Sequence, residues 1–539
     1  MSDTRGDGTR SIADTIHSIL RIKLFSNTLH IYHNFQPERI FMSGIRKQAI
    51  ISSILVYIGI PFGALNTYFF VKQGVFNSDQ YGLTRLFNDV GQNFFVLASL
   101  GVIPLVYKFY PYYKDNLADS ENDLLGKTFF KAFIGFILVT IASFIFEPLV
   151  IRKFSARSAL FVQYYFWVLP YGFGILFFSL LEGYAWALQK TILSNFLRET
   201  GMRLFTTLFI LLYFFGIVGF HGFMMLFSLL YIIIAVILLI HLIRTKKFHF
   251  TFKTSRVTKK FGKKMLSMQL LIFGGIIITT IGQTVDGMII SSLLGLTPNA
   301  IYSLALYTAN LIQIPQRSIQ SISIGVLVRM WKDKNMPEIK RIYQRSSINM
   351  LLISLFILGN IWLNIVDGLQ VFHVQEQYAA GIPLLLIFGI IRIIDAGTGV
   401  NAQVIAASNF WRFEFISGII MLALRIPLSY IFIKNFGIIG SAYGDLISLT
   451  VYNFIRFEFL RRKFHMQPFT MQTIYSIALA FIAYFITYFL FRDLSGWPAI
   501  ISRSALFSAL LISGTFLFKL TPDAMQLYDV AKKRLGLAK

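Results

Sequence analysis

Charged and amide side chains interrupt several long apolar stretches of this sequence. Arginine in such a setting suits phosphate, because its planar guanidinium stays charged and bonds two oxygens at once. A carboxylate there can take up a proton or hold a cation. Candidate anion-binding residues are Arg85, Asn88, Gln313, Arg317 and Arg392, and candidate ion-coupling residues are Asp89, Glu182, Asp286 and Asp395.

Two of these sites also have a purely structural interpretation. Arg85 and Asp89 are spaced i,i+4, and Arg392 and Asp395 are spaced i,i+3. Residues at these spacings share one face of a helix, so each pair can neutralise itself within the membrane. A structural pair and a binding site therefore remain equal alternatives for both.

Some of the other charged residues in the apolar stretches can be explained without a functional role, and others cannot. Arg425 and Asp445 fall near the ends of their apolar stretches, where we expect contact with lipid headgroups. Arg317 follows Pro315 inside a stretch with no other charge. Arg317 is therefore the strongest candidate for a cavity that holds an anion.

Other kinds of chemistry are excluded or unsupported. The chain has no cysteine, so disulfides, thiolate metal sites and cysteine nucleophiles are ruled out. The eight histidines are scattered and show no metal-ligand spacing. We expect no metal and no cofactor.

Composition identifies the elements that must position these residues. Of 539 residues, 55% are hydrophobic and 14% are charged, whereas a soluble domain carries about 25% charged residues. A transmembrane helix needs about 20 mostly apolar residues. The sequence predicts an all-α polytopic membrane protein with about fourteen spans, near 48–71, 83–107, 128–147, 159–187, 202–218, 222–243, 265–293, 300–328, 346–366, 380–407, 413–433, 437–458, 471–491 and 499–519.

The net charge of +25 follows the predicted topology. With an even number of spans both termini share one side, and most of the 50 Lys and Arg residues fall on that side, above all in the segment 244–264. Cytoplasmic loops collect Lys and Arg, so both termini are predicted to be cytoplasmic. The bias argues for contact with anionic membrane lipids and against nucleic acid as a partner.

Two segments at the ends of the chain have a different character. Residues 1–47 lack the apolar core of a signal peptide and contain an amphipathic stretch. Residues 520–539 are similar and basic. We expect both to be cytoplasmic tails, either lying on the membrane surface or simply solvated.

The spans contain an internal repeat. Phe215-Gly216-Ile217-Val218-Gly219 recurs 221 positions later as Phe436-Gly437-Ile438-Ile439-Gly440, each time between two spans. Six spans per copy give two lobes of parallel orientation, and transporters of this kind hold substrate between such lobes. The predicted units are an N-lobe at 48–243, a basic linker at 244–264, a C-lobe at 265–458 and two further spans within 459–519.

The two lobes, the repeated glycine motif, the Leu100-Gly101-Val102 and Pro104 exit of the second span and the two extra spans resemble the bacterial polysaccharide flippases. These belong to the multidrug/oligosaccharidyl-lipid/polysaccharide exporter superfamily. The resemblance implies a protein of the bacterial inner membrane, which flips an undecaprenyl-pyrophosphate-linked oligosaccharide between leaflets by alternating access. It also implies a cationic cavity and coupling to a proton or sodium gradient, with no covalent chemistry.

Alternatives within the superfamily are a multidrug or cation antiporter and a lipid II flippase. Cationic drugs favour an acidic pocket, so the three candidate arginines, Arg85, Arg317 and Arg392, argue against the antiporter, as do the two extra spans. A polysaccharide polymerase or ligase is an alternative of another class. It is expected to carry a large external loop, and every loop on the predicted outer side is short.

Overall fold

The chain was analysed as a computed structural model that describes residues 55, 57–245 and 248–526. The chain divides into the units Met1–Ile54 and Leu55–Lys539, and the description concerns the second. The predicted tail at 1–47 and most of 520–539 lie outside the described residues. The described part is helical, with a single isolated β-bridge between Lys72 and Val374.

The first half of the described chain forms nine helices separated by short turns. They are Tyr57–Val71, α3 (Ser78–Ser99), α4 (Ile103–Asn116), α5 (Leu124–Phe154), α6 (Ala159–Tyr164), α7 (Val168–Ala187), α8 (Thr191–Phe196), α9 (Met202–Phe214) and α10 (Phe220–Arg244). A π-helical turn, η4 (Leu197–Gly201), joins α8 to α9.

The second half continues in the same way. Its helices are α11 (Arg256–Leu293), α12 (Leu296–Asn310), α13 (Gln313–Lys332), α14 (Met336–Val371), α15 (Ile382–Gly397), α16 (Asn401–Ala407), α17 (Trp411–Phe436), α18 (Ile439–Phe464), α19 (Met471–Leu490) and α20 (Gly496–Leu517). The start of α11 at Arg256 lies inside the segment predicted as a linker, 244–264.

The prediction of an all-α polytopic membrane protein is confirmed. Ten helical stretches among the described residues are long and apolar enough to cross a membrane. Helices also occupy the other four predicted regions, near 57–71, 202–214, 296–332 and 439–464, but these are shorter, interrupted or more polar. The count of fourteen spans stays a prediction.

Three predicted spans, 83–107, 300–328 and 380–407, are interrupted rather than continuous. Between α3 and α4, Leu100 and Gly101 both have a positive φ, 45° and 70°. A Cβ at Gly101 would lie 2.8 Å from the Cβ of Phe273 on α11, so only glycine fits this turn. Gly399 (φ 65°) makes a similar break between α15 and α16.

The first glycine of the repeated motif has a positive φ in both copies. Gly216 follows α9 with φ 71°, and Gly437 follows α17 with φ 67°. Each glycine leads into the next long helix, α10 or α18. Both turns use the left-handed region that favours glycine, as expected for two copies of one structural unit.

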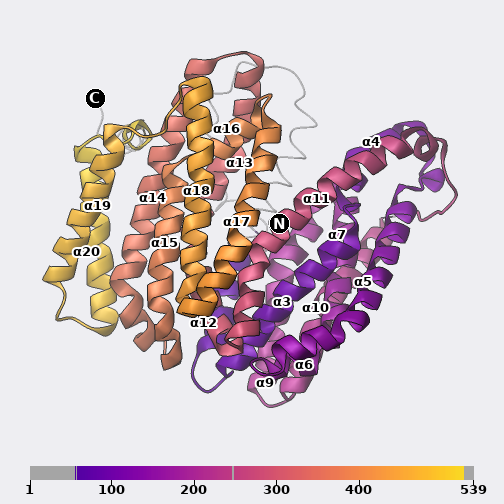
Figure 1. The fold of residues 1–539 in the computed structure, drawn as a ribbon, viewed down its shortest axis with the longest axis horizontal. Coiled ribbons are helices and arrows are strands. Elements are labelled where there is room, and N and C mark those ends of the chain that lie inside the picture. The colour runs from indigo at the N-terminus through magenta and orange to yellow at the C-terminus, as the bar shows by residue number, and fades with distance from the viewer. Residues whose placement is uncertain (1–54, 56, 246–247, 527–539) are drawn as a thin grey trace, which may run out of the picture. The chain divides into compact units, whose positions relative to one another are not determined.

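Apart from α11, which packs against the first half along its length, the described halves share a buried cluster at one end of the helices and not at the other. The shared cluster contains Phe76 and Tyr81 from the first half and Leu296, Ile301 and Tyr378 from the second. We call this the junction end, where α3 and α12 begin. Figure 1 shows the starts of α3 and α12 near its lower edge.

The opposite end is called the linker end, where α11 begins and α18 ends. There the buried side chains form two separate clusters. One joins Tyr113 and Leu238 to Val257 of α11, and the other joins Leu327 to Leu460. The helices α4 and α13 lie well apart near the upper edge of Figure 1. Apart from α11, the two halves are therefore packed together mainly at the junction end.

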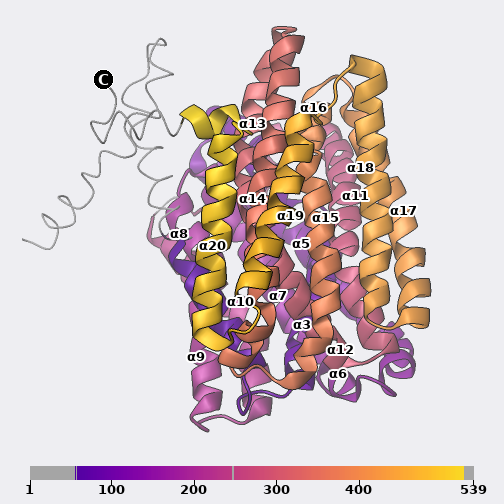
Figure 2. The ribbon, with the colours of Figure 1, turned by 90° about the vertical axis from the view of Figure 1, so that its left-hand side faces the viewer.

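A buried ion pair, together with a cluster of apolar side chains, holds the last two helices against the second half. Arg503 of α20 donates from Nη1 to Asp367 Oδ2 of α14 at 2.5 Å, and both side chains are buried. Asp367 Oδ1 also accepts from the backbone N–H of Gly496 at 2.7 Å. Figure 2 shows α19 and α20 in front of α14, against which both pack.

Candidate functional site

The junction between α3 and α12 is short and polar, and the backbones of the two helices lie very close to each other. The hydroxyls of Ser78 and Thr297 lie 2.7 Å apart, and Thr297 also donates to Asp79 Oδ1 at 2.7 Å. Asn299 Nδ2 donates to the carbonyl of Gly82 at 3.3 Å. A Cβ at Gly82 would lie 2.0 Å from Leu296 O, so glycine lets the two backbones touch.

Loops extend this junction beyond the helices. Gln375 donates from Nε2 to the carbonyls of Lys72 and Phe76, at 3.2 and 2.8 Å. The backbone N–H of Gln73 donates to His373 O at 3.1 Å. Neutral hydrogen bonds of this kind exchange readily for water, because each contributes only about 0.5–1.5 kcal/mol net. Each of these loop hydrogen bonds can therefore be lost at a modest cost.

Helix α11 contacts both halves of the protein. In its first part, Gln269 donates to Leu100 O at 2.8 Å and accepts from Lys131 Nζ at 3.0 Å. Further along, Thr284 accepts from Asn93 Nδ2 at 2.7 Å. Its last part carries Asp286, which binds α17 of the second half. A movement of one half against the other must therefore bend α11 or break one of these sets of contacts.

A buried triad of charges joins three helices of the second half. Arg425 of α17 lies 2.5 Å from Asp286 Oδ2 of α11 and 2.7 Å from Asp445 Oδ1 of α18. The exposed fractions of these side chains are 11%, 1% and 4%. The expectation that Arg425 and Asp445 contact lipid headgroups is wrong. Their partner Asp286 is 139 positions from Arg425, too distant for a sequence pattern to reveal.

Polar atoms near the triad remain unpaired. Among the described residues, Arg425 Nε, Asp286 Oδ1, Arg392 Nε and the Tyr302 hydroxyl are buried without a hydrogen-bond partner in the protein. Such orphaned groups are rare in packed proteins and mark places where water, a proton or another partner can bind. This region combines two carboxylates and two guanidinium groups inside the membrane part of the fold.

The structure does not pair Arg392 with Asp395. Arg392 donates to Asn310 Oδ1 at 2.9 Å, so its charge is held by a neutral amide. Asp395 accepts instead from Gln316 Nε2 at 2.6 Å and from Asn453 Nδ2 at 3.3 Å. The two residues are on one helix, but the neighbouring helices supply different partners to each.

Arg85 and Asp89 are not paired either. The Arg85 guanidinium lies over the ring of Tyr81, 5.7 Å from its centroid. Asp89 lies against α11, because a Cβ at Gly287 would be 2.2 Å from Asp89 Oδ2. Asn88 accepts from the hydroxyl of Tyr171 at 3.3 Å. The local pairs that the spacing allows therefore form no ion pair among the described residues.

Arg317 lies on α13 and is exposed, while Gln313 on the same helix is half-buried. Within the described part of the chain Arg317 makes no ion pair or side-chain hydrogen bond. The described contacts therefore do not bring Arg317 together with Arg85 or Arg392. An uncompensated guanidinium on a helix of the membrane part needs a hydrated or anionic surrounding.

Glu182 is paired with a residue that the sequence pattern did not identify. Arg198 donates from Nε to Glu182 Oε1 at 2.6 Å, and from Nη2 to Oε2. The sequence places Arg198 in a loop, whereas α8, η4 and α9 form one continuous helical run over 191–214. The apolar residues on both sides of Arg198 were the available signal.

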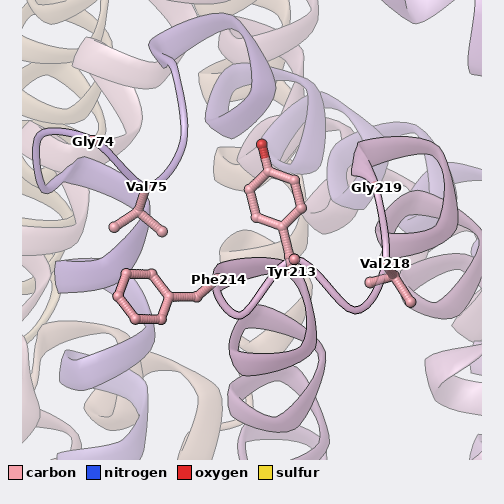
Figure 3. Close-up of a pocket in the computed structure, with 7 residues that line it drawn as sticks. Gly74, Val75, Tyr213, Phe214, Val218 and Gly219 are labelled. Carbon is pink, nitrogen blue, oxygen red and sulfur yellow. The ribbon is translucent and has the colours of Figure 1, made fainter.

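One further pocket lies at the junction end. Its volume is about 380 Å³, and Gly74, Val75, Tyr213, Phe214, Val218 and Gly219 are among its lining residues. Figure 3 shows that it lies between the loop after Tyr57–Val71 and the loop after α9. It has no charged side chain in its lining, so it offers no anchor for an anion.

Comparison with known proteins identifies solved structures of similar fold. Searches found no matching family model and no matching curated protein. A solved structure of the lipid II flippase MurJ, in an inward closed conformation, matches with a TM-score of 0.67 at 15% identity, covering 87% of this chain and 98% of that one. The fold of this chain is therefore similar to that of the solved flippase.

Two further solved structures agree. An inward-facing multidrug resistance MATE family transporter of the MOP superfamily matches with a TM-score of 0.61 at 15% identity, covering 77% of this chain and 98% of the other. A MOP superfamily transporter from Pyrococcus furiosus matches with a TM-score of 0.51 at 14% identity, covering 78% and 96%. The resemblance to this superfamily that the sequence indicated is confirmed at the level of fold.

Proposed function

We propose that this protein is a flippase that moves a lipid-linked oligosaccharide, through its pyrophosphate, from the inner to the outer leaflet of the bacterial inner membrane. The observation that carries the proposal is the packing of the two halves, which, apart from α11, share a buried cluster at the junction end and form separate clusters at the linker end among the described residues. Alternating access needs two halves that separate at one end while they touch at the other. No bond of the cargo changes, so the protein is not an enzyme.

The distribution of basic loops gives the direction. The loops at the linker end, including 244–264, are the basic ones, and cytoplasmic loops collect Lys and Arg. The linker end is then cytoplasmic, as are both termini, and the described conformation accepts cargo from the inner leaflet. Outward release requires the junction of α3 and α12 to open.

The arginines within the membrane part fall into two groups. Arg425 and Arg503 are each held by buried carboxylates. Arg85, Arg317 and Arg392 form no ion pair among the described residues. Arg85 lies over the ring of Tyr81, and Arg392 donates to the amide oxygen of Asn310. Arg317 makes no side-chain hydrogen bond in the described part of the chain. A guanidinium without a carboxylate is available for an anion, which supports the second group as the pyrophosphate ligands. Asn88 and Gln313 are suited to bind sugar hydroxyls.

Ion coupling requires a carboxylate that can change its proton or cation during transport. The candidates are Asp89, Glu182, Asp286 and Asp395. Asp286 has the strongest support, because it contributes to the buried triad and one of its oxygens has no protein partner among the described residues. The coupling ion is a proton or sodium.

Substitution of Arg317 tests directly whether this arginine binds the pyrophosphate of the cargo. We expect Arg317→Ala to abolish surface polysaccharide in cells that depend on this protein, and Arg317→Lys to restore it only in part, because lysine lacks the planar fork. Arg329→Ala is the matched control, since Arg329 is exposed on the same helix and pairs with Asp333. Normal polysaccharide with both Arg317 variants, at normal protein level, would remove Arg317 from the mechanism.

A second candidate cargo is lipid II, because the MurJ structure with a TM-score of 0.67 is named a lipid II flippase. The two cargoes share a prenyl pyrophosphate and differ in their sugars. Depletion of the cell's lipid II flippase separates them. Rescue of growth by this protein would favour lipid II, and accumulation of lipid-linked oligosaccharide on the cytoplasmic leaflet after its deletion would favour the polysaccharide precursor.

A further inference from the structure

A second cavity, with charged side chains in its lining, lies within the first half, away from the junction and the triad. Its volume is about 270 Å³, and its lining includes Tyr107, Ser179, Glu182, Trp186 and Arg198. Residues of α3, α4, α7, α10 and η4 form most of its wall, and Ile276 of α11 completes it. The cavity is therefore part polar and part aromatic, as suits a group that joins a charged head to an apolar chain.

The two residues of the ion pair in this cavity differ in their exposure to solvent. Glu182 is 3% exposed, whereas the side chain of Arg198 is 44% exposed. Arg198 uses Nε and Nη2 to hold the carboxylate, and Nη2 also approaches Ser179 Oγ at 3.4 Å. Its Nη1 has no hydrogen bond to a described residue. A ligand can thus reach the guanidinium while the carboxylate stays hidden behind it.

The surroundings leave Glu182 dependent on this one cation. Glu199 lies on the same π-helical turn as Arg198 and is paired with Arg203. Tyr231 of α10 faces the pair, and its hydroxyl donates to Met202 Sδ at 2.9 Å. Within the described part of the chain, Arg198 is the cation bonded to Glu182. π-Helical turns are frequent at functional sites, because the extra residue re-aims a side chain.

We propose that this cavity captures a phosphate group carried by a membrane lipid, and that capture is linked to proton uptake by Glu182. The phosphate binds the exposed edge of Arg198 and draws the guanidinium away from the carboxylate. A buried carboxylate without its cation is costly, so Glu182 takes a proton from water in the cavity. When the phosphate leaves, Arg198 returns to Glu182 and the proton is released to the same side.

This inference rests on the proposed function and adds an entry step to it. Glu182 then serves capture, and the coupling ion is left to Asp89, Asp286 and Asp395. The phosphate can belong to the prenyl diphosphate of the cargo or to a glycerophospholipid headgroup. Both offer the same oxygens to a guanidinium, so the experiment must separate them.

Calorimetric titration of the full chain in phosphatidylcholine nanodiscs tests the proposal. The probes are geranylgeranyl diphosphate, phosphatidylglycerol and inorganic pyrophosphate, each titrated in two buffers of different ionisation enthalpy, which yields the protons taken up on binding. We expect the wild type to gain up to about one proton per bound diphosphate beyond the uptake of Glu182→Gln. That variant should bind at least as tightly, because Arg198 is released.

Two variants of the same helical turn complete the design. Arg198→Gln should weaken binding by about tenfold or more, as expected for loss of a charged hydrogen bond. Glu199→Gln should keep both the affinity and the proton uptake of the wild type, and it reports any general effect of removing a carboxylate here. The melting temperature of each variant shows that the fold is retained.

The outcomes separate this inference from the proposed function. Equal proton uptake by the wild type and Glu182→Gln overturns the capture site, and so does diphosphate binding that Arg198→Gln leaves unchanged while Arg317→Ala abolishes it. Failure of every probe to bind the wild type overturns the capture site and the cargo together. Equal binding and uptake with phosphatidylglycerol supports the site and assigns it to a lipid headgroup.

Discussion

Replacing Arg425 by glutamine should destabilise the protein more than any other single charge removal in the second half. Two carboxylates, 1% and 4% exposed, share this one guanidinium at 2.5 and 2.7 Å. Breaking a buried ion pair costs about 3–5 kcal/mol, because it leaves a buried charge uncompensated. Here two like charges are left facing one another, so we expect a value at the upper end of that range.

Thermal unfolding of the purified protein in detergent, followed by tryptophan fluorescence, measures this loss. Arg461→Gln is the control, because Arg461 forms an exposed pair with Glu458 and such pairs contribute about 0–1 kcal/mol. Adding Asp286→Asn and Asp445→Asn to Arg425→Gln should recover most of the stability, since the triple variant buries no charge at the triad. An Arg425→Gln protein as stable as the wild type would refute the reasoning.

Two further predictions concern the ends of the fold. Arg503→Ala should cost about 3–5 kcal/mol by leaving Asp367 unpaired, and limited proteolysis should then cut near α19 and α20 first. Gly216→Ala and Gly437→Ala should each cost about 1–2 kcal/mol, because both glycines have a positive φ and open space around them. Gly325→Ala, in a helix with similar open space, should be neutral or stabilising. Equal melting temperatures for all three glycine variants would contradict the interpretation of the repeat.

The sequence was sufficient for the fold class, and the two-lobe repeat stays a prediction. Long apolar stretches dictate helices in a membrane, because every backbone group must be satisfied within its own segment. The glycines at 216 and 437 were visible as a motif, and the structure gives both a positive φ. The sequence marked Leu100-Gly101-Val102 and Pro104 as the exit of the second span, but not the close approach of Phe273 from α11 that leaves no room for a side chain at Gly101.

The partners of the membrane charges were beyond the reach of sequence patterns. Local spacing suggested that Arg392 pairs with Asp395, but helix packing gives Arg392 to Asn310. Arg425 is 139 positions from Asp286, and Arg198 was assigned to a loop although it holds Glu182. A single sequence carries no signal for contacts between distant helices, whereas i,i+3 and i,i+4 spacing can be seen directly in the sequence. Local pairs were therefore overestimated and distant ones missed.

The central claim is that α3 and α12 must separate at the junction end during each transport cycle. The hydroxyls of Ser78 and Thr297 lie 2.7 Å apart, and the chain has no native cysteine, so Ser78→Cys with Thr297→Cys gives one defined cross-link. A matched control joins α14 to α20 within the second half, through Asn364→Cys and Ser504→Cys, whose polar atoms lie 3.0 Å apart.

The decisive measurement is lipid-linked oligosaccharide flipping in proteoliposomes before oxidation, after oxidation and after reduction. We expect oxidation to stop flipping by the Ser78/Thr297 cysteine variant, reduction to restore it, and the Asn364/Ser504 cysteine variant to remain active throughout. Undiminished flipping by fully cross-linked Ser78/Thr297 protein would contradict alternating access through this junction.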